Sequence, residues 1–410
     1  QAWRAASGPL GVYVHVPFCA RRCLYCGCHV QIARDRGLGT TYVDDLIREL
    51  DVMADTTDFH RPLRLVALGG GTPTWLAWPD LQRLVTAIRA RTAPTTDSEW
   101  SIEVDPRSIT ADDAHRLVAL GFNRVSLGVQ DLDPQVLEAI GRPQPAEQVA
   151  AIAKAFGDVR LNFDLMIGLP RQTEASVVET VRRAVAMGPS RLSVFGYAHV
   201  PWMRAHQRGM ERFGLPDDDA RLRLTLAARA TLIALGYAPI GLDHYARADD
   251  PLALALHGGT LGRNFMGYTD HGDVDLVGVG VSAIGCVGGA FAANERDLGR
   301  WQQRVRAGLP SWERGLLRSD DDTVRGWVIE RLMCDLRVDK PTFSARFGRP
   351  FDATFADARV ACAPYVEAGL LRDDDDSLAI DGDGWLVARN VAAAFDAYLG
   401  LGNARYSRTV

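Results

Sequence analysis

The sequence predicts an α/β protein, namely a partial (β/α)6 barrel followed by a mostly helical C-terminal domain of winged-helix type. Two observations predict this fold. From residue 11 to about 200, short apolar, β-branched runs alternate with longer stretches of helical periodicity. From about Asp320 the pattern changes to successive helices and one short, turn-rich hairpin. Because a helical stretch follows each short run of the first part, we expect a parallel sheet with right-handed crossovers.

Six runs have the length and composition of strands, and five amphipathic stretches between them have those of helices. The predicted strands are Val12–Val16, Leu63–Leu68, Trp100–Val104, Arg124–Gln130, Leu161–Ile167 and Arg191–Tyr197. The predicted helices are Tyr42–Met53, Trp78–Arg91, Ala111–Leu120, Ala146–Ala155 and Ala175–Met187. Ligands of such folds bind at the carboxyl ends of the strands, so we expect the site there.

The C-terminal part is expected to form four helices and one hairpin. The helices are Thr323–Leu336, Thr342–Phe347, Phe355–Ala368 and Gly384–Tyr398, and the hairpin is Leu370–Ile380. A winged-helix arrangement is usually associated with DNA binding, but this hairpin carries Asp373–Asp376, which would repel phosphates. The net charge of −5 also provides no attraction for a polyanion, so we expect no nucleic-acid partner.

We place the domain boundary near residue 315. Residues 1–315 form the catalytic domain, with a partial barrel of about 11–240 and an active-site extension of about 240–315, and residues 316–410 form the C-terminal domain. Leu276–Ala293 is uncharged but contains five glycines, so we interpret it as a buried, glycine-rich segment and expect no membrane span. The absence of an export signal and the clustered cysteines indicate a reducing cytoplasm.

Four of the seven cysteines lie within ten residues, and Cys19, Cys23 and Cys26 form a C-x3-C-x2-C pattern after the first predicted strand. Three thiolates can ligate three irons of a 4Fe-4S cluster and leave the fourth iron open. The open iron can bind the amino and carboxylate groups of S-adenosylmethionine (SAM), and electron transfer then yields methionine and a 5′-deoxyadenosyl radical. The spacing therefore predicts a radical SAM enzyme.

A zinc site is the alternative for the same cysteines, with Cys28 as a fourth ligand. Zinc prefers four closed ligands, and the spacing from Cys26 to Cys28 is cramped for a tetrahedral site. We therefore favour an iron–sulfur cluster over zinc. Cys28 itself stays open as a ligand, a neighbour of the ligands or a plain small residue.

Other polar or flexible residues follow the predicted strands in the same way. Gly69–Gly71 lets the backbone approach a ligand closely, and Thr72-Pro73 fixes the turn. Glu103 and Asp164 are carboxylates within apolar strands, where an unpaired charge is costly. We expect a ribose diol or a cationic amine as their partner, while a structural salt bridge is an equal alternative for Asp105.

Beyond these local patterns, nearly the whole chain resembles the oxygen-independent coproporphyrinogen III oxidases, a family of radical SAM enzymes. The matching stretches include YVHVPFCARRCLYCGC, GGGTPTWL, SIEVDPRSI, GFNRVSLGVQDLD, NFDLMIGLPRQT, DHYARADD, RNFMGYT, GDVDLVGVGVSAIG and the terminal YSRTV. DHYARADD and RNFMGYT lie outside the SAM core and are therefore more specific than the cysteine motif. The presence of Cys28 also distinguishes this family from similar heme chaperones, which lack it.

The resemblance implies a cytoplasmic monomer with one 4Fe-4S cluster and two SAM molecules. Such an enzyme oxidatively decarboxylates two propionates of coproporphyrinogen III to vinyl groups, gives protoporphyrinogen IX, and takes electrons from a donor such as flavodoxin or ferredoxin. The implied contacts of the cluster-bound SAM are Tyr13, Tyr25, Gly70, Glu103 and Ile284. Those of the second SAM are Gly71, Thr72, Gln130, Arg142, Asp164 and Ala198. The implied catalytic residues are Cys28, Phe265 and Met266.

Three positions depart from the family's pattern. Met266 stands where the family has Gln, Gly196 where Asn is common, and Gly262 where His is usual. All three changes remove polar groups near the expected substrate pocket. They leave open a radical methyltransferase that uses the second SAM as methyl donor, an anaerobic heme-degrading enzyme, and a heme-trafficking protein without catalytic activity.

Overall fold

The computed structural model describes residues 2–399, which form two compact units. The first unit comprises the residues up to Leu235 together with Asp273–Leu317. The second comprises Gly236–Gly272 together with the residues from Arg318 onward. The terminal motif YSRTV, which contributed to the resemblance, lies outside the described residues.

Six parallel strands form the middle of the sheet in the first unit and confirm the predicted order. They are β1 (Leu10–Val16), β4 (Pro62–Gly70), β5 (Ala93–Val104), β6 (Arg124–Gln130), β7 (Arg160–Ile167) and β8 (Arg191–Gly196), neighbours in this order. All seven residues of β1 are buried, as expected for a parallel strand covered on both faces. The carboxyl ends of the six strands meet at one edge of the sheet.

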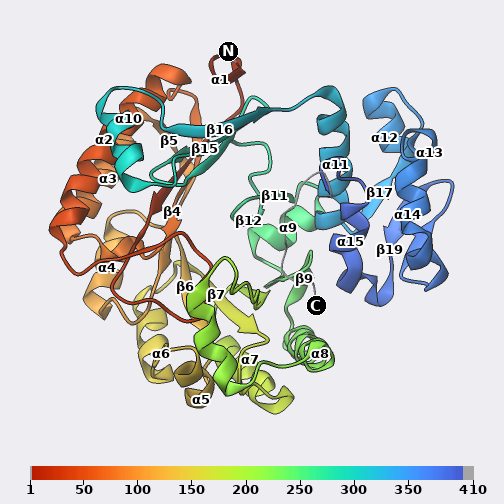
Figure 1. The fold of residues 1–410 in the computed structure, drawn as a ribbon, viewed down its shortest axis with the longest axis horizontal. Helices are drawn as coiled ribbons and strands as arrows, with labels where there is room; N and C mark the ends of the chain where they lie inside the picture. Colours follow the sequence, from red (N-terminus) through yellow and green to blue (C-terminus); the bar gives the residue numbers. More distant parts are fainter. Residues whose placement is uncertain (1, 400–410) are drawn as a thin grey trace. The chain divides into compact units, whose positions relative to one another are not determined.

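The five predicted helices connect these strands. They are α2 (Gly37–Thr56), α3 (Trp78–Arg91), α4 (Ala111–Ala119), α6 (Ala146–Ala155) and α7 (Glu174–Ala186), and Figure 1 shows them around the outside of the sheet. Local sequence sets two of their starts, because the side chains of Thr110 and Thr173 accept hydrogen bonds from the first turns of α4 and α7. Shorter elements of this unit are α1 (Ala2–Ala5), β2 (Phe18–Cys19), β3 (Gln31–Ile32), η1 (Pro73–Trp75), α5 (Pro134–Ala139), η2 (Ala205–Phe213) and α8 (Asp218–Ala234).

A second group of strands extends the sheet beyond β1. Strand β13 (Asp275–Val279) runs parallel to β1, and β14 (Ile284–Val287), β15 (Ala290–Asn294) and β16 (Trp312–Leu317) continue antiparallel, with α10 (Leu298–Arg306) before β16. A Cβ at Gly278 would lie 2.5 Å from the carbonyl oxygen of Ile284, so the close approach of these chains requires glycine. The glycine-rich segment Leu276–Ala293 thus forms strands, and within residues 2–399 every helix is too short or too polar to span a bilayer.

One buried acid joins helix α2 to this second group of strands. The side chain of Glu49 has no exposed surface, and its carboxylate accepts four hydrogen bonds. The donors are Gly280 N–H at 2.6 Å, Asn294 Nδ2 at 3.0 Å, Trp301 Nε1 at 3.1 Å and Ser311 Oγ. Burial raises the pKa of Glu49 to about 7, and the four donors oppose that rise.

The second unit contains the predicted C-terminal helices and hairpin. Its helices are α9 (Pro251–His257), α11 (Asp320–Cys334), α12 (Lys340–Phe347), α13 (Phe351–Thr354), α14 (Ala356–Glu367), η3 (Gly382–Val387) and α15 (Ala388–Ala393). Its strands are β9 (Ala238–Ile240), β10 (His244–Ala246), β11 (Gly262–Asn264), β12 (Gly267–Thr269), β17 (Arg337–Asp339), β18 (Leu371–Asp373) and β19 (Ser377–Ile380). Strands β17, β19 and β18 form a small antiparallel sheet with helices around it (Figure 1), which agrees with the winged-helix-like prediction.

The predicted last helix, Gly384–Tyr398, is wrong in its extent. The chain forms the 3-10 helix η3 first, and α15 ends at Ala393. Trp385 and Phe395 are both buried, and Phe395, beyond the end of α15, belongs to the core cluster of this unit.

The domain boundary near residue 315 stays a prediction. One segment of the predicted catalytic domain belongs to the second unit of the structure. Residues 236–272, expected as part of the active-site extension of the catalytic domain, pack in the second unit. The hydroxyl of Tyr268 donates to the carbonyl of Met333 at 2.8 Å, and Arg331 Nη2 donates to the carbonyl of Leu261 at 2.9 Å. These contacts join residues that are far apart in the sequence, so no local sequence pattern could predict them.

Candidate active site

The cysteines of the predicted motif lie on the loop that follows β1. Cys19, Cys23 and Cys26 are free thiols, as are the other four cysteines of the chain. Thr72 Oγ1 lies 3.3 Å from Cys19 Sγ, and the N–H of Thr72 donates to the carbonyl of Phe18 at 2.9 Å. The loops after the neighbouring strands β1 and β4 therefore lie against each other at the carboxyl edge of the sheet.

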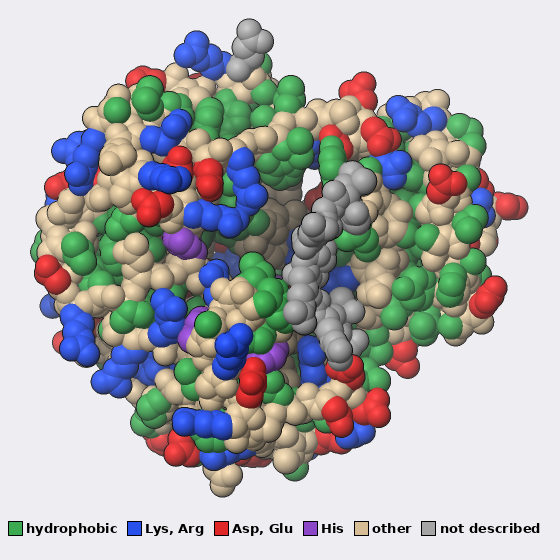
Figure 2. Space-filling view, viewed as in Figure 1, with side chains coloured by type: hydrophobic (Ala, Val, Ile, Leu, Met, Phe, Trp, Pro, Cys, Tyr) green, Lys and Arg blue, Asp and Glu red, His purple; other side chains and the backbone are tan. Residues whose placement is uncertain are grey.

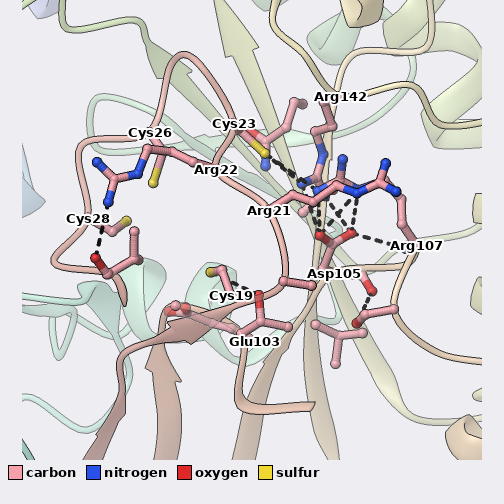
Figure 3. Close-up of a pocket in the computed structure, with 18 of the residues that line it drawn as sticks. Cys19, Arg21, Arg22, Cys23, Cys26, Cys28, Glu103, Asp105, Arg107 and Arg142 are labelled. Atoms are coloured by element: carbon pink, nitrogen blue, oxygen red, sulfur yellow. Dashed lines mark hydrogen bonds and ion pairs between the residues drawn. The ribbon is translucent and has the colours of Figure 1, made fainter. Parts of the chain in front are cut away.

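The cysteine loop borders a cavity of about 650 Å³ within the first unit. Figure 3 shows the side chains of Cys19, Cys23 and Cys26 around a shared space. Among the described residues, these three sulfurs do not form a group within 4.8 Å of one another, whereas sulfur ligands of one tetrahedral zinc ion lie about 3.8 Å apart. Three thiolates around a wider space fit a 4Fe-4S cluster with one open iron better than they fit zinc.

Most residues predicted to contact SAM line the same cavity. They are Tyr25, Gly70, Gly71, Thr72, Glu103, Gln130, Arg142 and Asp164, and Cys28 lines it as well. They come from the cysteine loop, from the end of β4 and the loop after it, from strands β5, β6 and β7, and, for Arg142, from the chain beyond α5. The fold thus brings together side chains that are far apart in the sequence, as the edge rule for parallel sheets predicted.

Three predicted SAM contacts of the first unit do not line this cavity. Tyr13 is buried within β1, and its hydroxyl lies 3.0 Å from His15 Nδ1. Ala198 is exposed after β8, and Ile284 is exposed at the start of β14. Their contacts with SAM stay predictions.

The two remaining candidates, Phe265 and Met266, lie between β11 and β12 of the second unit, and their catalytic role stays a prediction. The structure explains one departure from the family's pattern in the same hairpin. A Cβ at Gly262 would lie 2.5 Å from the Cα of Gly272, so the local packing leaves no room for the usual His. Gly196 is exposed at the end of β8, and nothing in the structure explains its loss of a side chain.

Glu103 lies beneath the glycine loop that follows β4. Its Oε2 accepts the N–H of Gly70 at 3.0 Å, and a Cβ at Gly69 would lie 2.7 Å from its Oε1. Gly70 has a φ of +109°, and a Cβ there would lie 2.5 Å from the ring of His15. The glycine run is therefore required by the packing of this loop over Glu103 and His15.

The cavity wall beside Glu103 is negatively charged. Burial and then the charge of Asp164 raise the pKa of Glu103 to about 7. Asp164 accepts hydrogen bonds from Ser126 Oγ and Asn162 Nδ2, both at 2.8 Å, so these neutral donors hold it in place. A wall with two carboxylates suits a ligand that carries positive charge or hydroxyl groups.

Asp105 takes part in an ion-pair network on another wall of the cavity. Its carboxylate lies 2.7 Å from Arg107 Nη2 and 3.0 Å from Arg142 Nη2, as the dashed lines in Figure 3 show. Both guanidinium groups also reach Cys23 Sγ at 3.5 Å. The salt-bridge interpretation of Asp105 is thus confirmed, and sequence analysis missed Arg107. The available signal was an arginine two residues after an acid at the end of a predicted strand.

Replacing Asp105 by alanine should lower the free energy of unfolding by about 2 kcal/mol, because Arg107 and Arg142 would lose their shared counter-ion. Urea unfolding of the metal-free protein measures this loss. The matched control is Asp158→Ala, which removes an exposed acid that has no ion-pair partner in the described part of the chain and should change stability by less than about 0.5 kcal/mol. Equal stability of the two variants would contradict the role of the network.

Cys26 and Cys28 form a hydrogen-bonded pair. This contact lowers the pKa of Cys26, and the same contact together with burial raises the pKa of Cys28. Burial also raises the pKa of Cys19 to about 11. Cys28 is therefore a direct neighbour of one candidate ligand.

Comparisons with known proteins agree with this geometry. Residues 13–184 match the radical SAM superfamily, and residues 319–387 match the HemN C-terminal domain. An oxygen-independent coproporphyrinogen III oxidase of Bradyrhizobium diazoefficiens is 41% identical over 409 residues, which cover 99% of this chain and 90% of that protein. A protein of the same name from Escherichia coli K12 is 39% identical, over 95% of this chain and 86% of that protein. A solved structure of coproporphyrinogen III oxidase (HemN) from Escherichia coli, a radical SAM enzyme, matches with a TM-score of 0.93 at 38% identity, over 97% of this chain and 92% of that one.

Proposed function

The chain belongs to the family of oxygen-independent coproporphyrinogen III oxidases, and from this premise we propose how its cavity performs the family's reaction. It is a radical SAM enzyme that oxidatively decarboxylates two propionates of coproporphyrinogen III to vinyl groups and gives protoporphyrinogen IX. The observation that carries this function is the similarity over nearly the full length of both units. The relatives do not favour a methyltransferase or a heme-degrading enzyme.

In this proposal Cys19, Cys23 and Cys26 hold the 4Fe-4S cluster. When bound, the cluster supplies the electron that splits SAM into methionine and a 5′-deoxyadenosyl radical, which takes a hydrogen atom from the propionate. Glu103 and the peptide groups of the glycine loop orient the cluster-bound SAM. The negative wall formed by Glu103 and Asp164 stabilises its sulfonium charge.

The second SAM is assigned to the wall formed by Thr72, Gln130, Arg142 and Asp164. Gln130 has a φ of +68°, an unusual conformation for a residue other than glycine, and it ends strand β6 within the cavity. Such strain persists where the surroundings hold a side chain in one orientation, which is typical of ligand sites. Gly71, also on the cavity wall, lets the backbone approach the ligand.

The direct test is an anaerobic assay with reconstituted protein, SAM, a chemical reductant and coproporphyrinogen III. We expect each reacting propionate to lose one carbon dioxide, one hydrogen atom and one electron, and we expect methionine and 5′-deoxyadenosine as products of SAM. Mass spectrometry of the tetrapyrrole and of the SAM products measures both. Formation of S-adenosylhomocysteine and a methylated tetrapyrrole, without release of carbon dioxide, would contradict decarboxylation.

Glu103→Gln should weaken SAM binding by about tenfold or more at pH 8, because a charge-assisted hydrogen bond becomes a neutral one. With a pKa of about 7, the wild-type carboxyl is protonated at pH 6 and ionised at pH 8. Its hydrogen bond therefore strengthens as pH rises, and SAM binding should release protons between pH 6 and 7. Calorimetry at pH 6, 7 and 8 in two buffers measures the affinity and the released protons.

The matched control for this prediction is Glu138→Gln, which changes an exposed acid outside the cavity. Its iron content and SAM affinity should equal those of the wild type. The iron content of Glu103→Gln should also be unchanged, because Glu103 ligates no iron. Equal affinity of the Glu103 variant and the wild type at pH 8 would remove Glu103 from the SAM site.

We further propose that the enzyme is a cytoplasmic monomer and receives electrons from an acidic protein such as a flavodoxin or a ferredoxin. The cysteine loop carries Arg21, Arg22, Arg34 and Arg36, all exposed, but only one acid, Asp35. This local excess of positive charge contrasts with the net charge of −5 for the chain. Figure 2 shows further Lys and Arg side chains on the visible face of the first unit. A basic surface beside the cluster cysteines would attract an acidic donor.

Reversing two of these charges, Arg21→Glu with Arg22→Glu, should raise the KM for reduced flavodoxin by about tenfold at low ionic strength. The effect should shrink as salt is added, because salt screens exposed charges. Steady-state assays at several donor and salt concentrations measure it, with dithionite as donor in a parallel series.

The control for the charge reversal is Arg182→Glu, on the exposed side of helix α7. It carries one reversed charge away from the cysteine loop and should leave the KM unchanged. Arg21 and Arg22 also line the cavity, so the dithionite series separates the two effects: a rate that falls equally with dithionite would place the effect in the cavity and not in docking. Equal KM values for the donor protein in both variants would place the donor elsewhere.

A further inference from the structure

The segment that follows β8 crosses the cysteine loop and binds its backbone. Three consecutive carbonyl groups of the loop, those of residues 25, 26 and 27, each accept a hydrogen bond from a different side chain of this segment. The bonds are Gln207 Nε2 to Tyr25 O at 2.9 Å, His206 Nε2 to Cys26 O at 2.8 Å, and Arg204 Nε to Gly27 O at 2.9 Å. The central acceptor belongs to one of the three cluster cysteines.

The amide of Gln207 can adopt one orientation only. Its Oε1 accepts the N–H of Val200 at 2.7 Å, while its Nε2 donates to the carbonyls of Tyr25 and of Ala198, the latter at 3.2 Å. Exchanging the amide oxygen and nitrogen would oppose all three partners. The side chain is 1% exposed, so water does not replace a lost bond, and Gln207 links its own segment firmly to the cysteine loop.

Apolar packing joins the same two segments. Leu24, which lies between Cys23 and Tyr25, belongs to a core cluster with Met210 and Ile140, and its N–H donates to the carbonyl of Ile140 at 3.0 Å. A Cβ at Gly209 would lie 3.3 Å from Leu24 Cδ2, so the helix η2 comes close to the loop at this point. The cysteine loop is thus held by side-chain packing as well as by the three hydrogen bonds.

The crossing segment has internal support of its own. The hydroxyl of Tyr197 lies 2.9 Å from His199 Nδ1, and His199 Nε2 lies 3.1 Å from Glu211 Oε1. These contacts tie the beginning of the segment to the far end of η2. Because its own hydrogen bonds make this segment rigid, it can restrain the cysteine loop that it contacts.

We propose that Arg204, His206 and Gln207 form a clamp that positions the backbone around Cys26 and so determines how firmly the third thiolate holds the 4Fe-4S cluster. The inference rests on the proposed function in one respect, that the cysteine loop binds the cluster. Between Cys23 and Cys26 the loop has one recorded backbone bond of its own, Cys26 N–H to Cys23 O at 3.3 Å. The Leu24 contacts hold the first part of this stretch, and the clamp supplies the side-chain hydrogen bonds to the carbonyls of residues 25–27. A ligand loop held in its bound geometry loses less conformational freedom when the metal group binds.

The test compares the rate at which an anaerobic iron chelator strips the reconstituted holoenzyme. Arg204→Ala and His206→Ala should each lose iron about threefold to tenfold faster than the wild type, since each lacks one hydrogen bond to the loop. Gln207→Glu should act likewise, because a carboxylate still accepts from Val200 but cannot donate to Tyr25. The matched control is Arg208→Ala, an exposed neighbour on the same helix that makes no hydrogen bond or ion pair within residues 2–399, and it should lose iron at the wild-type rate.

Two further measurements separate positioning from a general loss of stability. The unfolding temperature of metal-free Arg204→Ala and His206→Ala, two half-buried positions, should stay close to that of the wild type. The electron paramagnetic resonance signal of the reduced cluster should change in the clamp variants alone. Arg204→Lys and His206→Gln restore a donor to the same carbonyl and should slow iron loss toward the wild-type rate. Iron loss in all clamp variants at the rate of Arg208→Ala would overturn the clamp and leave the proposed function intact. A wild-type protein that assembles no cluster would overturn both.

Discussion

Replacing Cys19, Cys23 or Cys26 by alanine should abolish SAM cleavage, because in the proposed site each residue supplies one of the three thiolates that hold the cluster. A cluster with two protein ligands is held weakly, so the iron content of each variant should fall as well. Burial raises the pKa of Cys19 to about 11, so this thiol must release its proton when the cluster assembles. Iron and sulfide analysis together with the yield of 5′-deoxyadenosine measures the loss.

Two other cysteines serve as matched controls. Cys362 is buried in the core of the second unit, and Cys362→Ala should keep both iron and SAM cleavage. Cys28→Ala should keep its iron, because three ligands remain, and the vinyl product then reports whether Cys28 acts in catalysis. Full activity in a Cys23→Ala variant, or bound zinc in the wild type, would contradict the cluster assignment.

Replacing Glu49 by alanine should lower the free energy of unfolding by about 4 kcal/mol, the largest stability effect that we expect, because four buried donors lose their acceptor. The donors belong to Asn294 of β15, Trp301 of α10, and Gly280 and Ser311, which adjoin β13 and β16, all in the segment that extends the sheet beyond β1. Urea unfolding at pH 6 measures the loss. The control is Asp55→Ala, an exposed acid on the same helix, which should change stability by less than about 0.5 kcal/mol.

The pH dependence of this effect follows from the raised pKa of Glu49. With a folded pKa of about 7 and an unfolded value of 4.5, the folded protein binds more protons between these two values. The contribution of Glu49 to stability therefore falls as pH rises from about 4.5 to 7. The difference between the wild type and Glu49→Ala should be larger at pH 6 than at pH 8. A difference that grows with pH would contradict the raised pKa.

Local periodicity in the chain predicted most of the fold. All six parallel strands and all five intervening helices lie where the alternation of apolar runs and amphipathic stretches indicated, because a strand or a helix buries a face that is visible in a short window. The end of the last helix was wrong for the opposite reason. There, Phe395 packs beyond the end of α15 into the core of the second unit, and this packing involves residues far along the chain.

The cysteine motif and the carboxylates on the strands could be read from the chain, because a cluster needs ligands at close spacing and a charge in an apolar strand is conspicuous. Residues that act through partners far along the chain carry no such signal. The role of Arg107 is visible only in the folded protein, where it contacts Asp105 and Cys23 beside Arg142. His206 lies 180 residues from Cys26, whose carbonyl it binds.

The sequence by itself determined the class of fold, the order of its strands and the family, and it predicted the cluster ligands, since each of these depends on residues adjacent or regularly spaced in the chain. The tertiary structure alone decided which charges pair around the cavity, that residues 236–272 pack with the C-terminal helices, and which side chains hold the cysteine loop. Contacts of this kind join residues that are far apart in the sequence. These residues come close together only when the whole sheet has folded and its loops have packed against one another.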